Sequence, residues 1–129
     1  MLGVATIGLL LVLALAVGLV GVGVAIHIQV TAAADAAALA AAPVTFRPFG
    51  ASGTPRSEAA AYARRNGATL VRCRCSVDRT WRRRTVIVEV ARQLAIPGTG
   101  RVAFRAESRA TFDPALLVGI PGAPTGASG

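Results

Sequence analysis

The chain begins with an apolar run that no charged residue interrupts. From Leu2 to Ile26 the only polar side chain is that of Thr6. About 20 apolar residues cross the hydrocarbon core of a bilayer as a helix, so this run is long enough to span a membrane with a margin for tilt. A cleaved secretory signal is the alternative, but such signals combine a basic start with a shorter apolar run. We therefore expect an uncleaved, single-pass membrane anchor.

An alanine-rich segment follows the apolar run without a helix breaker. It extends from Thr31 to Ala42 and carries a single charge, at Asp35. Alanine has the highest helix propensity, so the pattern predicts one continuous helical rod over residues 1–42, roughly 60 Å long. We expect Pro43 to end the rod, because the proline ring clashes with the preceding turn.

Beyond the rod, the pattern changes to that of a small α+β domain. Residues 43–56 hold several prolines and glycines and are predicted to be a linker. Thr54-Pro55 or Ser57 can start the next helix, which covers Ser57–Asn66 with Glu58 in its favourable first turn and Gly67 as its stop. Alternation of apolar and polar residues then predicts three strands, over Ala68–Val77, Arg84–Leu94 and Arg101–Phe112.

The links between these strands are short, which favours an antiparallel meander. They fall at Asp78–Arg83 and Ile96–Gly100, and residues 57–113 are expected to form one head. Frequent glycine and proline over residues 114–129 predict a disordered tail. The expected fold class is therefore α+β: a long N-terminal transmembrane helix continues into an Ala-rich helix, and a short helix then packs on the apolar face of a three-stranded antiparallel sheet.

Charge is confined to the part outside the apolar run. All 14 basic residues are arginine, the formal net charge is +8, and the first arginine is Arg47. The positive-inside rule gives no orientation, because neither short flank of the apolar run carries arginine or lysine.

Small residues form a stripe on one face of the predicted membrane helix. They are spaced four, three and four apart, at Ala14, Gly18, Gly21 and Ala25. Such a stripe lets another membrane helix approach closely. Glycine and alanine are also common in membrane helices of this composition, so helix packing at these residues and simple composition are both open.

The junction between the two halves of the rod resembles a known family. The apolar helix runs directly into VTAAADAAALAAA, at Val30–Ala42. This is similar to the TadE/TadG-like proteins of Tad (Flp) pilus assembly, which commonly show an AADAAALAAA segment just after the membrane span. The later NGATL, at Asn66–Leu70, followed by Cys73, is similar to the short actinobacterial branch of secretion- or DNA-translocation-related TadE-like proteins. The motif residues carried over are Ala34, Asp35, Ala36, Ala37 and Leu39.

The resemblance implies a pilin-like, non-enzymatic component of a pilus or secretion apparatus. Its partners would be the membrane and other Tad components, contacted through the N-terminal helix, and its C-terminal domain would lie on the extracytoplasmic side. One feature departs from pilins, which are typically cut after a glycine and carry a glutamate five residues into the mature chain. Gly3 is the candidate glycine, but the residue five further on is Gly8. Either the protein is not processed like a pilin, or a short basic leader precedes the given start, and both alternatives stay open.

The two cysteines, Cys73 and Cys75, lie two positions apart in a predicted strand. This spacing points both thiols to one face and sets their Cα atoms about 6.8 Å apart, the outer limit for a disulfide. Unpaired thiols, a disulfide within or between chains, and a metal or redox role are the alternatives. A metal site is the weakest of these, because the chain has no Cys-x-x-Cys and no histidine nearby.

The densest charge lies in the link after the first predicted strand. An arginine cluster with an aromatic residue suits the phosphates of nucleic acids, anionic lipids or cell-wall polymers, although a solvated turn is the simpler interpretation. The alternative function is thus a membrane-tethered basic domain that binds DNA or anionic surface polymers. The candidate contact residues are Arg79, Trp81, Arg82, Arg83 and Arg84.

Nothing in the pattern indicates catalysis. The chain has no nucleophile elbow, phosphate-binding loop or dinucleotide fingerprint. His27, the only histidine, lies where the apolar run ends and is expected to cap the span. We therefore expect no catalytic residue, no metal, no cofactor and no small-molecule substrate.

Overall fold

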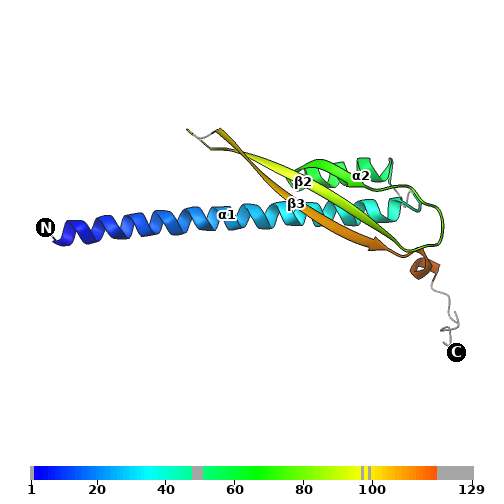
Figure 1. Cartoon of the computed structure of the whole chain (residues 1–129), viewed down its shortest axis with the longest axis horizontal. Coiled ribbons are helices and arrows are strands. Elements are labelled where there is room, and N and C mark those ends of the chain that lie inside the picture. The colour runs from blue at the N-terminus through cyan, green and yellow to red at the C-terminus, as the bar shows by residue number, and fades with distance from the viewer. Residues whose placement is uncertain (1, 48–50, 97, 99, 119–129) are drawn as a thin grey trace, which may run out of the picture.

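The structure, a computed structural model, describes residues 2–47, 51–96, 98 and 100–118. Figure 1 shows one long helix with a small head gathered around its C-terminal half. The predicted α+β class is confirmed, with a long N-terminal helix, a short helix and a three-stranded antiparallel sheet. The elements are α1 (Leu2–Val44), α2 (Pro55–Arg65), β1 (Thr69–Arg74), β2 (Arg84–Ile96), β3 (Gly100–Phe112) and a short 3-10 helix, η1 (Pro114–Val118).

Helix α1 runs for 43 residues without interruption, which is about 64 Å at 1.5 Å per residue. The prediction that Pro43 ends the helix is wrong, because Pro43 lies inside the last turn. Proline removes a single backbone N–H, and the turn still closes through bonds from the N–H groups of Phe46 and Arg47 to the Pro43 carbonyl, both 3.1 Å long. The Thr45 hydroxyl also donates to the Ala42 carbonyl, at 2.6 Å.

Helix α2 begins at Pro55, the earlier of the two starts that the sequence allows, because Thr54 caps it. The Thr54 hydroxyl oxygen accepts a 3.2 Å hydrogen bond from the Ser57 N–H, and Pro55 occupies the first helical position. Both choices are favourable at a helix N-terminus. The chain leaves α2 through Gly67, whose φ of 74° is a conformation that glycine adopts without strain.

The sheet has the order β1-β2-β3, with β2 antiparallel to both neighbours. β1 ends at Arg74, before its predicted end at Val77, and it carries a bulge between Leu70 and Arg72. The bulge shifts the alternation, so that Leu70 and Cys73 pack against the core. Strict alternation over the predicted strand would set Val71 and Val77 on the same face as Cys73, but Val71 is 40% exposed and Val77 is 58% exposed.

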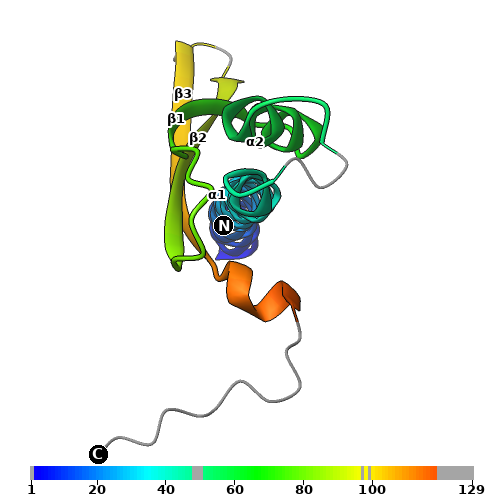
Figure 2. The ribbon, with the colours of Figure 1, turned by 90° about the vertical axis from the view of Figure 1, so that its right-hand side faces the viewer.

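The apolar face of the sheet is covered by α1 rather than by the short helix. Six alanines of α1 are at most 4% exposed, and they share one core with the buried valines of β2 and with the α2 residues Ala59 and Ala63. Viewed along α1, the sheet is one layer and the two helices lie beside each other in a second (Figure 2). Alanine side chains are small, so α1 can approach both neighbours closely. The α1 alanines are Ala33, Ala34, Ala37, Ala38, Ala41 and Ala42.

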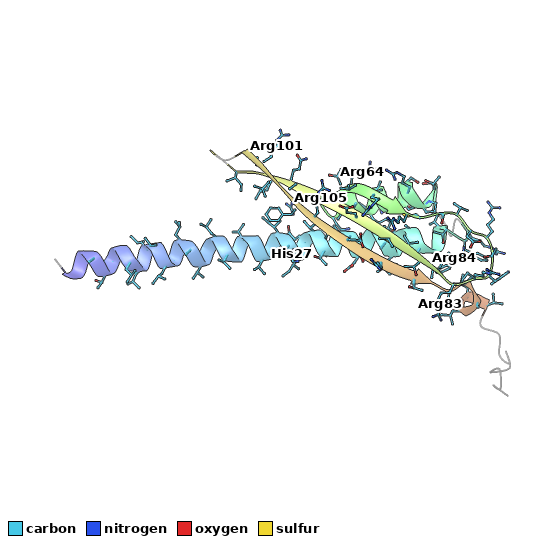
Figure 3. The ribbon with its side chains drawn as sticks, in the orientation of Figure 1. His27, Arg64, Arg83, Arg84, Arg101 and Arg105 are labelled. Atoms are coloured by element: carbon cyan, nitrogen blue, oxygen red, sulfur yellow. A yellow bond between two sulfur atoms is a disulfide. The ribbon has the colours of Figure 1, made fainter. Side chains whose placement is uncertain are left out.

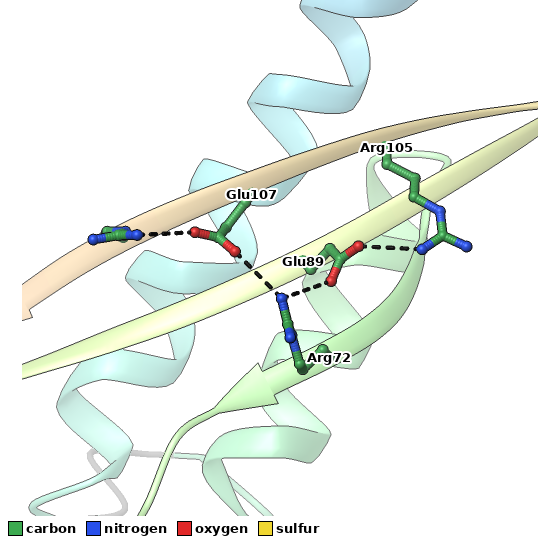
Figure 4. A network of polar contacts seen from close by, with 5 residues as sticks. Arg72, Glu89, Arg105 and Glu107 are labelled. Carbon is green, nitrogen blue, oxygen red and sulfur yellow. Dashed lines mark hydrogen bonds and ion pairs between the residues drawn. The ribbon is translucent and has the colours of Figure 1, made fainter.

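The outer face of the sheet carries ion pairs across the strands (Figure 4). Glu89 of β2 and Glu107 of β3 lie opposite each other in the register. The Arg72 guanidinium bridges the two carboxylates, at 3.2 Å from Glu89 and 3.5 Å from Glu107. Arg105 and Arg109 each pair with one of these carboxylates as well. The arginines thus offset the repulsion between two like charges that face each other.

The N-terminal half of α1 lies outside the head. Its large apolar side chains from Ile7 to Val24 are 52% to 71% exposed. Among the described residues, α1 is the one helix long and apolar enough to cross a membrane, and the chain is compatible with a single-pass membrane protein. Of the predicted tail, Pro114–Val118 forms η1, and residues 119–129 lie outside the described residues.

Candidate functional site

The predicted stripe of small residues lies on the free side of α1. Ala14, Gly18, Gly21 and Ala25 are all exposed. At 3.6 residues per turn, the stripe is about 180° around the helix from the alanines that pack in the head. A Cβ atom added at Gly18 or Gly21 would meet no described atom within 4 Å. The stripe is therefore open to another helix.

The same helix face continues beyond the apolar run, which sequence reasoning missed. Ile28, Ala32, Asp35 and Leu39 extend the spacing of three and four residues, and all four are exposed. Ile28 is 61% exposed and Leu39 is 67% exposed. Alternating steps of three and four are the pattern by which helices pack along a common seam. We call this face the α1 seam: Ala14, Gly18, Gly21, Ala25, Ile28, Ala32, Asp35 and Leu39.

The residues of the alanine-rich motif divide between two faces of α1. Ala34 and Ala37 are fully buried in the core of the head, and Ala36 is half-buried. Asp35 and Leu39 lie on the α1 seam. The Asp35 carboxylate accepts a hydrogen bond from the Ser108 hydroxyl of β3, so the charge is tied to the sheet at the border of the seam.

A shallow hollow lies along the α1 seam where the helix leaves the apolar run. It has a volume of about 360 Å³ and is lined by His27, Ile28, Thr31, Ala32 and Asp35. The Thr31 hydroxyl donates to the His27 carbonyl at 2.9 Å, so it is satisfied within the helix. The hollow is thus mainly apolar with a carboxylate at one end.

The two cysteines form an intrachain disulfide, one of the alternatives left open by the sequence. Their Cα atoms are 5.3 Å apart, closer than in a fully extended strand. Cys75 lies outside β1, which ends at Arg74. In the described part of the chain, no group of three or more His, Cys, Asp or Glu side chains is arranged to hold a metal ion.

Two arginines of the predicted cluster, Arg83 and Arg84, make contacts within the head. The Arg84 guanidinium donates to the carbonyls of Thr80 and Arg82, and it also lies 5.4 Å from the centroid of the Phe46 ring. Arg83 forms an ion pair of 3.4 Å with Asp113. Arg83 and Arg84 therefore hold the link between β1 and β2 in place, at the end of the head far from the N-terminus of α1 (Figure 3).

An open cleft of about 470 Å³ lies at the same end of the head, lined by Phe46, Arg47, Arg79 and Trp81. We call it the distal cleft. The Phe46 and Trp81 rings meet edge to face at 5.0 Å between centroids, and the Arg47 guanidinium lies 5.4 Å from the Phe46 centroid. Trp81 is 53% exposed. Two arginines beside an exposed aromatic ring can hold an anion and stack a planar group.

Phe46 and Arg47 were not among the predicted contact residues, because they lie in a different segment from Arg79 and Trp81. The signal available in the sequence was that Arg47 is the first basic residue after the rod. The fold joins the segments through a 2.9 Å bond from the Asp78 N–H to the Thr45 carbonyl. Sequence reasoning therefore found half of the distal cleft.

Asp78 is the described carboxylate next to the distal cleft whose pKa is displaced. The pKa of Asp78 lies below its ordinary value, chiefly because the carboxylate accepts a 2.8 Å hydrogen bond from the Thr80 backbone N–H. The Thr80 side chain and the positive charges of Arg84 and Arg82 act in the same direction. The lowered pKa extends the anionic form of this carboxylate to more acidic pH than an ordinary aspartate would allow.

Comparisons of the chain with protein-family models, with curated proteins and with solved structures find no match.

Proposed function

We propose that the protein is a non-enzymatic, single-pass membrane component of a Tad/Flp-type pilus or secretion apparatus that assembles through α1. The observation that carries this proposal is the continuity of α1. One uninterrupted helix combines an exposed apolar half with a half that forms the core of a small α+β head. Such a subunit is pilin-like in architecture, and the Asp35 segment lies at the junction, as in the family that the sequence resembles.

The α1 seam supports lateral assembly. In a bilayer, helices associate through close van der Waals contact, which small residues permit. The seam offers small residues in the apolar half and exposed Ile28 and Leu39 in the other half. Because the head packs on the opposite face of α1, a neighbouring helix can follow the seam from one half into the other.

The disulfide supports an extracytoplasmic head. Disulfides form and persist in oxidising compartments and are rare where thiols are kept reduced. The Cys73–Cys75 bond lies in the head, so the proposed topology places the N-terminus of α1 toward the cytoplasm and β1–β3 outside.

Photo-cross-linking in membranes tests the assembly proposal. The chain has no lysine, so a photoreactive amino acid is needed in place of amine reagents. Introduced at Ile28 on the α1 seam, it should form cross-linked products with a second copy or with another apparatus component. The matched control is Leu19, which is 68% exposed and lies about 180° around the helix from Ile28.

A double substitution sharpens this test. Gly18→Leu with Gly21→Leu should abolish the Ile28 product, because the added side chains hold the helices apart. Gly23→Leu, on the opposite face, should leave it unchanged. Equal cross-linking from Ile28 and Leu19, or none in the native membrane, would reject assembly through the seam.

A second function, polyanion binding outside the membrane, is favoured by the distal cleft. Arg47 and Arg79 line it beside Trp81. Replacing both arginines with glutamine should weaken binding to heparin or single-stranded DNA and reduce its dependence on salt. Arg64→Gln with Arg65→Gln removes the same charge from α2 and serves as the control. Equal loss in both variants would point to net charge alone and reject the cleft.

A further inference from the structure

The β2–β3 hairpin extends well beyond the core of the head. The two strands stay paired as far as Ile96 and Gly100, whereas the last fully buried residue of β2 is Val90. Figure 1 shows this end of the hairpin leaving the head and pointing back along α1, toward the apolar half, while diverging from the helix. We call it the hairpin end: Ile96, Arg101 and Val102. Leu94, two residues before Ile96, still packs against the core.

The depth of the hairpin end follows from one contact. The Arg92 guanidinium donates to the Gln29 side-chain carbonyl of α1, which sets the level of that part of β2. The four residues from Arg92 to Ile96 rise about 13 Å, a length equal to about nine residues of helix. The inclined hairpin therefore ends between the levels of Val20 and Gln29. Figure 3 agrees, since Arg101 lies near the level of His27.

Along the axis of α1, the hairpin end thus lies level with the end of the apolar run. If α1 crosses a bilayer, this is the level of the bilayer surface. Its chemistry fits that surface. Leu94 and Val102 are opposite each other in the register, on the side of the sheet that faces α1. Val102 is 39% exposed and Ile96 is 38% exposed. Arg101 is exposed next to Val102 in the sequence, on the opposite face of the hairpin.

Apolar side chains next to an arginine are the pattern of segments that lie in the headgroup region. The apolar groups reach the acyl boundary, while the long arginine side chain keeps its charge among lipid phosphates. More than a third of the surface of Val102 and of Ile96 is exposed, and the hairpin has diverged from α1 at this end (Figure 1).

We propose that the hairpin end rests on the bilayer that α1 crosses, with Ile96 and Val102 at the acyl boundary and Arg101 on the phosphates of anionic lipids. This inference rests on the proposed membrane anchoring by α1. The head then touches the membrane at two separated points, so its tilt and rotation about α1 are set. That rotation in turn fixes the direction in which the α1 seam faces its neighbours.

Tryptophan quenching in full-length protein tests the contact. Trp81 is the only tryptophan, so a Trp81→Phe background allows single probes at Val102→Trp, at Ala14→Trp inside the proposed span, and at Thr111→Trp on the far part of β3. The protein is reconstituted in phosphatidylcholine vesicles with and without phosphatidylglycerol. Two sets of vesicles are prepared. In one set the lipid carries bromine near the headgroup end of its acyl chains, and in the other set it carries bromine near the chain ends.

Support would be quenching at Val102→Trp that exceeds that at Thr111→Trp by about threefold with bromine near the headgroup. Phosphatidylglycerol should increase this difference, and Arg101→Gln should remove the increase. Quenching at Ala14→Trp with none at Val102→Trp would overturn the contact and leave the anchor standing. No quenching at Ala14→Trp would overturn the anchor itself. Ile96→Trp repeats the measurement on the other strand, in case Val102→Trp fails to fold.

Discussion

The Ser108 hydroxyl of β3 donates a hydrogen bond to the Asp35 carboxylate of α1, across 73 positions of sequence. Asp35 is thus a fastening point between the long helix and an edge strand, in addition to being the one charge of the alanine-rich segment. The bond has a charged acceptor but lies at an exposed position, so its net contribution is about 1 kcal/mol.

Removing either partner of this bond should destabilise the head. We expect Ser108→Ala and Asp35→Ala each to lower the free energy of unfolding by about 1 kcal/mol. The measurement is urea unfolding in detergent micelles, followed by the fluorescence of Trp81. In the double variant the two losses should fail to add, because they remove the same interaction. Full additivity would show that the two side chains act independently.

Enlarging a buried alanine of α1 should be more damaging than losing that bond. Ala37 is 0% exposed in the core that α1 shares with α2 and the sheet, and added methyl groups there must push one neighbour away. We expect Ala37→Leu to lower the free energy of unfolding by about 3 kcal/mol. The matched control is Ala32→Leu on the exposed seam, which should change it by less than about 0.5 kcal/mol. Similar losses in both would contradict the close packing of α1.

The disulfide gives a prediction about location. In the membrane fraction, Cys73 and Cys75 should resist alkylation until a reductant is added, and then react twice per chain. Retargeting the head to the cytoplasm by reversing the orientation of α1 should leave both thiols reactive without reductant. Free thiols in the native orientation would exclude an oxidised, extracytoplasmic head. Because the loop it closes is very short, Cys73→Ser with Cys75→Ser should cost only about 1.5 kcal/mol of stability.

Asp78 gives the turn near the distal cleft a dependence on pH. Its pKa in the folded protein lies below the unfolded value of 3.8. Its stabilising contribution is therefore fully present above pH 3.8 and is lost as the pH falls through the lower, folded pKa. The difference in stability between the native chain and Asp78→Ala should close over that acidic range, as monitored by Trp81 fluorescence. Arg82→Gln removes the weakest of the causes that lower the pKa of Asp78. It should therefore reduce the stability difference that Asp78→Ala produces only slightly. A difference that stayed constant down to the acid limit would contradict the lowered pKa.

The elements of the fold were accessible from local patterns, because each has a period or composition of its own. The apolar run, the alanine-rich segment and the alternating strands are all present near their predicted places. The pattern did not predict which helix covers the apolar face of the sheet. Alanine lies on nearly every side of residues 31–42, so no apolar stripe marks the face that packs, and the smaller helix with a clear pattern was taken as the cover.

The candidate site was accessible only in part, for a related reason. Arg79 and Trp81 are recognisable from the charge and aromatic character of the link between β1 and β2. Phe46 lies beside them only because the fold brings the segment after α1 next to that link. The bulge after Leu70 likewise depends on pairing with β2, and it changes which residues of β1 face inward. Both features depend on contacts between segments that are distant in the sequence, so the local pattern of apolar and polar residues does not predict them.

The continuity of α1 also has a mechanical consequence. The helix contains no joint between its apolar half and the turns that fill the head, so a pull along its axis reaches the interface between helix and sheet directly. That interface lies along the direction of the pull, and its many small contacts carry the load in shear, together rather than one after another. The head cannot detach from the helix and remain folded, because the helix is its core. A subunit built this way withstands tension until the helix slides out of its own sheet.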